Sequence, residues 1–167
     1  MTMSRDPSGL RVLGVGTRMS RDDEVGLRLV KTLSERPEFA HRCTVYESMD
    51  AASLAAWLLE TKLPILIVDC ADMGASGGEA RCFSEKDAKL VVRSDSVSTH
   101  GLGAADAVAL ARALGFDAPV HFFGVQPFDL SPRMGLTEEM NALFPTLLER
   151  LESSINNLDA GPTRRFP

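Results

Sequence analysis

The sequence is poor in the features that mark several large classes of protein. It has 1 Trp, 1 Tyr and 3 Cys in 167 residues. No apolar run approaches the roughly 20 residues that a membrane-spanning helix needs. The first nine residues, MTMSRDPSG, hold no apolar stretch of the kind that forms a secretory signal. We therefore expect a cytoplasmic protein with no membrane partner.

The few cysteines argue against a disulfide scaffold. Cys43, Cys70 and Cys82 are odd in number, and no two of them form a C-x-x-C pair. Paired spacing is what a disulfide framework or a cysteine-based zinc site normally requires. The sequence predicts three reduced thiols.

The charge balance argues against nucleic acid as the main partner. The chain has 18 Lys and Arg against 23 Asp and Glu, a net charge of −5. Proteins that bind nucleic acid need a basic surface to neutralise phosphates. An apolar content of 44% and this length suit one globular domain. We expect that domain over residues 10–158, with unstructured segments at 1–9 and 159–167, and a monomer.

Apolar periodicity divides the domain into alternating strands and helices. It predicts strands at 10–15, 43–46, 64–69, 81–83 and 120–125, and helices at 22–33, 50–61, 101–114 and 136–158. Asp50 and Thr137 are predicted N-caps and Gly115 a C′ residue, while Pro145 should break or kink the last helix. The segment 86–98 looks polar and irregular. The expected fold is α/β, a three-layer αβα sandwich around a mostly parallel, twisted, five-stranded sheet.

The stretch GVGTRMSRDDEVG, residues 14–26, follows the first predicted strand and resembles a phosphate-binding turn. A dinucleotide fingerprint needs a third glycine where this chain has Met19, and no Gly-Lys-Ser/Thr follows. Three consecutive acids, Asp22, Asp23 and Glu24, would also cancel the positive helix N-terminus that attracts phosphate. A nucleotide-binding domain therefore stays a minor alternative, motivated by Gly14 and Gly16.

The acids have a structural interpretation and a functional one. Acids in a first helical turn interact favourably with the helix dipole, and Asp22 could be the N-cap of its helix. However, Asp69 ends the strand ILIVD, and His100 precedes a later helix. Ligands of such sheets bind at the carboxyl ends of the strands. Carboxylates and a neutral imidazole from separate loops would suit a divalent cation such as zinc or nickel, but chemistry alone does not choose among the three acids.

Other polar residues near the same edge have weaker signals. Asp72 could orient a ligand or cap its own loop. Gln126 and Pro127 end a strand at the ligand edge and could line a substrate groove. His121 shares a strand face with Phe123 and Val125, which favours a satisfied core or sheet-face histidine.

Taken in order, several segments resemble one family of enzymes. They are GVGTRMSRDDEVG, ILIVDCADMG followed by GGE, STHGLG before an Ala-rich helix, and FFGVQP followed by GLTEEM. Their order and spacing resemble the endopeptidases that mature [NiFe]-hydrogenase large subunits, from Leu10 to about Leu158. The first segment is similar to the family pattern G-x-G-N-x-x-x-x-D-[DE]-x-x-G.

The resemblance implies a site and a reaction. It assigns metal ligation and catalysis to Asp23, Asp69 and His100. It implies a transient partner, the large-subunit precursor, whose C-terminal extension is removed after nickel insertion. The divalent metal would then be nickel carried by the substrate rather than a resident cofactor, with zinc or cadmium able to substitute in vitro. Whether the metal activates water or polarises the scissile carbonyl, or whether Asp23 or Asp69 acts as general base, stays open.

Two positions depart from the family pattern. Thr17 stands where the family usually has Asn, and Glu24 where it usually has Gly. Thr can still make a turn hydrogen bond, whereas Glu24 makes the helix start bulkier and more charged. These departures motivate an alternative, a non-catalytic metal- or partner-binding module on the same fold.

Overall fold

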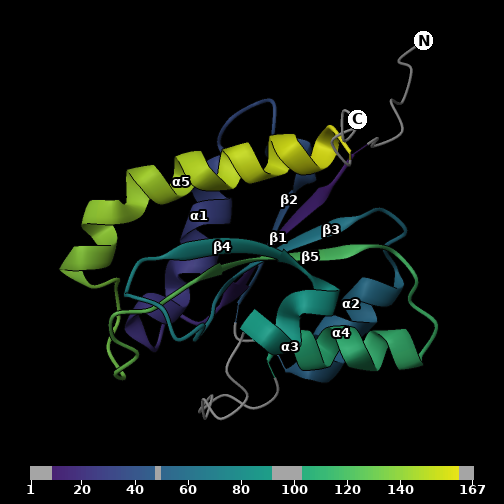
Figure 1. Cartoon of the computed structure of the whole chain (residues 1–167), viewed down its shortest axis with the longest axis horizontal. Helices are drawn as coiled ribbons and strands as arrows, with labels where there is room; N and C mark the ends of the chain where they lie inside the picture. The colour runs from purple at the N-terminus through teal and green to yellow at the C-terminus, as the bar shows by residue number, and fades with distance from the viewer. Residues whose placement is uncertain (1–8, 48–49, 92–102, 162–167) are drawn as a thin grey trace.

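The computed structural model describes residues 9–47, 50–91 and 103–161 of the chain (Figure 1). Within these ranges, no helix is both long enough and apolar enough to cross a bilayer. His100 and the serine-rich segment before it lie outside the described residues.

A five-stranded sheet forms the centre of the domain, in the order β2-β1-β3-β5-β4. Neighbouring strands are parallel except for β4, which pairs antiparallel with β5 at one edge. The predicted mostly parallel, five-stranded sheet is therefore confirmed. The strands are β1 Arg11–Gly16, β2 Cys43–Glu47, β3 Ile65–Cys70, β4 Ala80–Ser84 and β5 Val120–Val125.

Helices follow most of the strands, and short 3-10 turns precede several elements. The helices are α1 Val25–Ser34, α2 Ala51–Leu59, α3 Ala88–Val91, α4 Ala104–Ala113 and α5 Glu138–Asp159. The 3-10 turns are η1 Arg21–Glu24, η2 Ala40–Arg42 and η3 Glu85–Asp87. The turn η3 and the helix α3 replace part of the segment 86–98 that was expected to be irregular, so that expectation was wrong for residues 86–91.

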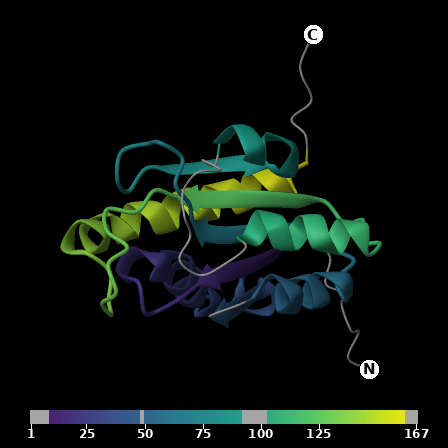
Figure 2. The same ribbon diagram turned by 90° about the horizontal axis from the view of Figure 1, so that it is seen from below.

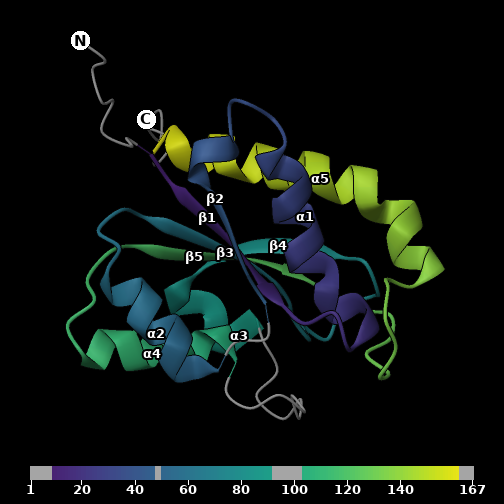
Figure 3. The same cartoon turned by 180° about the vertical axis from the view of Figure 1, so that it is seen from behind.

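The helices cover both faces of the sheet and make the predicted three-layer sandwich (Figures 1 and 3). On one face, α1 and α5 bury residues such as Leu29 and Leu151 against Val12, Leu66 and Phe123. On the other face, α2 and α4 bury Leu58 and Val108 against Leu13, Ile67 and Phe122. Successive residues of each strand thus enter opposite cores, because side chains alternate along a strand.

Gly26 explains how closely α1 approaches the sheet. A Cβ atom at this position would lie 2.3 Å from the carbonyl oxygen of Val68 and 2.7 Å from that of Val15. No larger residue fits there without moving the first turn of α1 away from β1 and β3. The glycine therefore holds the acidic turn η1 close to the carboxyl end of β3.

The predicted caps are present in the structure. The Asp50 carboxylate accepts a hydrogen bond from Ser53 N at 2.7 Å, and the Thr137 hydroxyl accepts one from Met140 N at 3.2 Å. Gly115 follows α4 with φ +105°, as a C′ glycine should. Pro145 does not break α5, which continues to Asp159. The α5 ribbon bends near its N-terminal end (Figures 1 and 3).

Candidate functional site

The carboxyl ends of β1, β3 and β5 lie at one edge of the sheet, as the parallel pairing requires. The loop that follows β1 (residues 17–24) and the loop between β5 and α5 (residues 126–137) meet there (Figure 2). Two backbone hydrogen bonds join them, from Arg21 N to Arg133 O at 2.9 Å and from Asp22 N to Asp129 O at 3.2 Å. The edge expected to bind ligands is therefore built from segments more than 100 residues apart in the chain.

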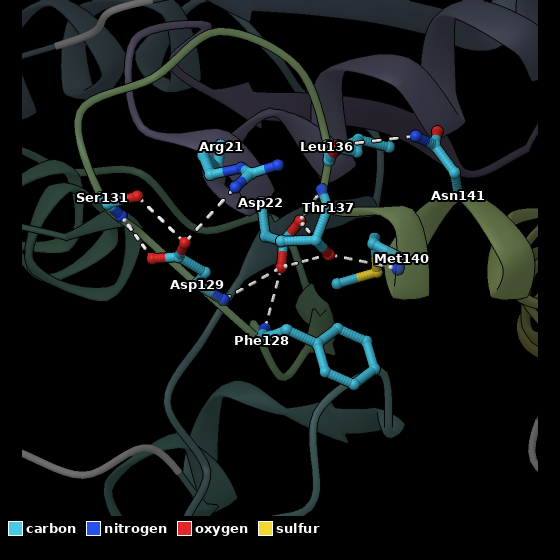
Figure 4. Close-up of polar contacts among 9 residues, drawn as sticks. All are labelled: Arg21, Asp22, Phe128, Asp129, Ser131, Leu136, Thr137, Met140 and Asn141. Carbon is cyan, nitrogen blue, oxygen red and sulfur yellow. Dashed lines mark hydrogen bonds and ion pairs between the residues drawn. The ribbon is translucent and has the colours of Figure 1, made fainter.

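Asp22 joins these two loops through its side chain (Figure 4). Its carboxylate is fully buried, with 0% exposure. It accepts hydrogen bonds from Phe128 N at 2.8 Å, Asp129 N at 3.2 Å, Thr137 N at 2.9 Å and the Thr137 hydroxyl at 3.0 Å. These donors compensate the cost of burying a charge. The expectation that Asp22 caps its own helix was wrong, because all these partners lie beyond β5.

Asp23 points back toward the end of β1. One of its carboxylate oxygens accepts a hydrogen bond from Thr17 N at 3.0 Å. Its backbone carbonyl lies so close to Gly16 that a Cβ atom there would be 2.1 Å away. Gly16 also has φ +148°, a conformation that residues with a side chain rarely adopt. The glycine turn therefore helps to fix the position of Asp23.

Asp69 is the next-to-last residue of the central strand β3 and lies near Asp23. Burial raises the pKa of the Asp69 carboxyl well above its ordinary value, and the negative charge of Asp23 raises it further. Both effects disfavour the ionised form of Asp69. The structure thus brings together two of the three predicted site residues, at a place where two carboxylates cannot both be charged without cost. A cation would remove that cost.

The third acid of the loop has a different partner. Glu24 lies 3.9 Å from Arg28, one turn along the helix. Since Asp22 is enclosed by its five hydrogen bonds and Glu24 is turned toward α1, Asp23 is the acid of this loop that faces Asp69. The Thr17 hydroxyl accepts a hydrogen bond from Met19 N at 3.2 Å, which confirms the turn bond expected of Thr at this position.

The third predicted ligand, His100, lies outside the described residues, so its position stays a prediction. Among residues 9–47, 50–91 and 103–161, no group of three His, Cys, Asp or Glu side chains could hold a metal ion by itself. The fit of a divalent cation therefore rests on the chemistry of the Asp23 and Asp69 pair. Carboxylate oxygens are ordinary ligands for such ions, and two of them leave positions for other donors.

Gln126 and Asp72 support the loop after β3. The Gln126 amide oxygen accepts hydrogen bonds from Met73 N at 2.7 Å and Ala75 N at 3.3 Å, and its amide nitrogen donates to Asp72 at 3.2 Å. Asp72 also accepts a hydrogen bond from Gly74 N at 3.0 Å. Gln126 is buried, and its side chain supports this loop. A place for Gln126 and Pro127 along a substrate groove stays a prediction. Asp72 caps its loop, as one of its two interpretations proposed.

His121 lies in β5 opposite Leu66 and Ser84. Its buried Nδ1 atom has no hydrogen-bond partner among the described residues. The histidine is therefore a sheet residue, as expected, although its Nδ1 atom is not satisfied by the described residues.

With this geometry in view, comparison with known proteins identifies the family. Residues 27–154 match the family model described as hydrogenase maturation protease. The chain belongs to the hydrogenase maturation protease family. The match begins within α1 and ends within α5. It includes Asp69 and the β5–α5 loop, and it begins after the loop that bears Asp23.

Individual members of the hydrogenase maturation protease family agree with this assignment. The hydrogenase 2 maturation protease of Escherichia coli is 26% identical over 151 residues, which cover 86% of this chain and 88% of that protein. The structure of the endopeptidase HybD from E. coli superposes with a TM-score of 0.71 at 22% identity, over 92% of this chain and 94% of that chain, and so shows the fold. HybD from Thermococcus kodakarensis gives a TM-score of 0.64 at 26% identity, over 88% and 99% of the two chains.

Proposed function

We propose that this maturation protease removes the C-terminal extension of a nickel-loaded [NiFe]-hydrogenase large-subunit precursor in the cytoplasm. In this proposal Asp23, Asp69 and His100 recognise the nickel that the precursor carries. The observation that supports it best is the Asp23 and Asp69 pair, in which burial and a neighbouring charge raise the pKa of Asp69. A precursor that brings a divalent cation to this pair would relieve the repulsion between the two carboxylates, whereas a precursor without the metal would not.

The pair also suits the hydrolytic step. Cleavage of a peptide bond by water needs a group that accepts a proton from the attacking water and returns one to the leaving amine. A carboxyl with a raised pKa performs both transfers more readily near neutral pH than an ordinary aspartate does. We propose that Asp69 contributes one carboxylate oxygen to the cation and uses the other for these proton transfers, since its burial persists when the cation is bound. Asp23 serves as a ligand only and holds the cation beside the scissile bond. The metal would supply positive charge at the reacting carbonyl.

The local contacts of Thr17 and Glu24 do not support the alternative of a non-catalytic module. The Thr17 hydroxyl closes the turn through Met19 N, and Glu24 turns toward Arg28. Neither departure from the family pattern obstructs the Asp23 side chain. The catalytic proposal therefore needs no restoration of the more usual Asn and Gly.

Processing of a purified, nickel-loaded large-subunit precursor tests the proposal directly. Cleavage would be read as a loss of mass, with wild type and with Asp23→Asn, Asp69→Asn and His100→Ala. We expect wild type to cleave and the three variants to be inactive while folded. His41→Ala and Glu24→Gln are matched controls, because His41 is exposed and Glu24 has its own partner; both should cleave like wild type. The proposal would be refuted if any of the three variants still cleaved the precursor, or if wild type did not cleave it.

A second measurement tests metal recognition without activity. Zinc or cadmium would be titrated into wild type, Asp23→Asn, Asp69→Asn and the two controls, and the melting temperature would be recorded. Binding to the folded state alone raises the melting temperature by mass action. We expect a rise for wild type and the two controls, and none for Asp23→Asn or Asp69→Asn. An equal rise in all five proteins would place the metal elsewhere.

A further inference from the structure

The two loops that Asp22 joins carry an unusual share of exposed apolar side chains. Eight large hydrophobic residues are exposed among the described residues, and four of them lie on these loops. We call these four the apolar rim: Met19 at 60% exposure, Phe128 at 41%, Leu130 at 48% and Met134 at 71%. Clustered exposed apolar residues mark interaction sites more often than scattered ones do.

The rim is held in place by polar contacts. The Asp22 carboxylate and the two backbone hydrogen bonds described above join the two loops. In addition, the Asp129 carboxylate accepts hydrogen bonds from Ser131 N at 2.8 Å and from the Ser131 hydroxyl at 2.9 Å. Arg21 lies 3.6 Å from the same carboxylate. These contacts fix the backbone on both sides of Leu130. A preorganised surface loses less conformational freedom on binding than a flexible one.

Within the rim, the Phe128 ring packs against a fixed part of the backbone. A Cβ atom at Gly77 would come within 2.3 Å of the Phe128 ring, and one at Gly78 within 3.1 Å. The ring therefore rests directly on the glycine pair before β4, with part of its surface exposed. Rigid aromatic side chains of this kind are frequent anchors in protein interfaces.

The rim is continuous with the proposed active site. Met19 N donates to the Thr17 hydroxyl, and Thr17 N donates to Asp23. Phe128 N donates to Asp22, the neighbour of Asp23. An extended peptide spans about 3.3 Å per residue, so residues a few positions from a bond held at Asp23 and Asp69 are within reach of these loops.

We propose that the apolar rim docks an apolar segment of the large-subunit precursor next to the cleaved bond. This inference rests on the proposed function, because the occupant is the substrate of the same site. The rim binds the segment by burying Met19 and Met134, the two most exposed of its side chains. Methionine adapts its shape to an apolar partner more easily than branched residues do.

The test compares a rim variant with a matched control variant. The double variant Met19→Ser/Met134→Ser removes the two methionines. The control Leu59→Ser/Leu114→Ser removes two exposed leucines, of 39% and 61% exposure, from the ends of α2 and α4. Steady-state cleavage of the nickel-loaded precursor gives kcat and KM. We expect the rim variant to raise KM by about tenfold with kcat little changed, and the control to leave both unchanged.

Direct binding separates the two proposals. The dissociation constant of the precursor would be measured by biolayer interferometry for the same proteins. Weaker binding by the rim variant alone supports the rim even if wild type proves unable to cleave, which would refute only the proposed function. Equal KM and equal binding in rim variant and wild type would overturn the rim. So would sedimentation showing wild-type dimers that the rim variant abolishes, because a second copy would then be the occupant.

Discussion

The carboxylate of Asp22 accepts hydrogen bonds from both the backbone amide and the hydroxyl of Thr137, 115 residues further along the chain. The same Thr137 hydroxyl accepts a hydrogen bond from Met140 N and so caps α5. One buried acid therefore links the loop after β1 to the start of the last helix. Asp23, the adjacent residue, is held by this link as well as by its contacts with Gly16 and Thr17.

Asp22→Asn should destabilise the protein strongly. The new amide group would face backbone N–H donors, so at least one donor would lose its acceptor. We expect the free energy of unfolding to fall by about 2–4 kcal/mol, the range for an unsatisfied buried group that formerly met a charge. Urea unfolding measures this fall. Glu24→Gln is the control, since a partly exposed ion pair contributes about 0–1 kcal/mol; equal losses in both variants would contradict the role of Asp22.

Asp69→Asn should stabilise the metal-free protein at neutral and alkaline pH. The raised pKa of Asp69 means that the folded state binds its proton more tightly than the unfolded state does. The free energy of unfolding of wild type should therefore fall as the pH rises from about 4 through the folded pKa. Asparagine does not ionise, so the variant escapes this loss.

Urea unfolding of Asp69→Asn and wild type between pH 3 and pH 9 checks this expectation. The two curves should converge at the acid end and separate as the pH rises. Asp50→Asn serves as a control of opposite sign, because hydrogen bonds from Ser53 lower the pKa of Asp50. That variant should not exceed wild type in stability at any pH. A constant difference between Asp69→Asn and wild type would exclude the titration of Asp69 as its cause.

Gly16→Ala should disrupt the site more than its backbone conformation alone predicts. A positive φ costs a residue with a side chain about 1–3 kcal/mol. At Gly16 the new methyl group would also collide with the Asp23 carbonyl. Gly115→Ala isolates the first effect, since Gly115 has φ +105° and nothing lies within 4 Å of its Cβ position.

Thermal unfolding and precursor cleavage should both distinguish these glycine variants. Gly115→Ala should lose stability modestly and retain cleavage. Gly16→Ala should lose more stability and should fail to cleave, because Asp23 must move. Full activity in Gly16→Ala would show that the position of Asp23 does not depend on the turn.

Cys43 should be almost inert to alkylation at pH 8. Burial raises the pKa of its thiol to about 11. Only about one thiol in a thousand is then ionised at pH 8, and the thiolate is the reactive form. Partial burial raises the pKa of the Cys82 thiol as well. However, Cys82 is an exposed residue, so the reagent can reach it. Iodoacetamide labelling followed by peptide mass spectrometry should therefore modify Cys82 before Cys43, and the reverse order would contradict the burial of Cys43.

Much of the fold could be predicted from the sequence because its signals are local. The run VHFFGV predicts β5 to the residue, and Asp50 and Thr137 cap the helices that they precede. The short helix α3 was missed because four residues carry too little periodicity to be recognised.

The candidate site was only partly predictable. Asp69 follows the buried apolar run ILIV within β3, which is a local signal. The choice among Asp22, Asp23 and Glu24 came from a family resemblance, because it depends on contacts with other parts of the fold, such as the bonds from Phe128 and Thr137 that enclose Asp22. The burial of Gln126 escaped prediction for the same reason, since its amide meets Met73 N and Ala75 N on another loop.

The position of Thr137 in the chain also determines when the protein can become active during its synthesis. The strands β1 and β3, which carry Asp23 and Asp69, leave the ribosome early. Asp22, however, obtains its donors only when residues 128–137 have been made and α5 can begin. Until then the Asp22 carboxylate lacks the hydrogen bonds from Phe128 and Thr137, and the loop that bears Asp23 is not attached to the rest of the site. We therefore expect a nascent chain to remain inactive until α5 has been made.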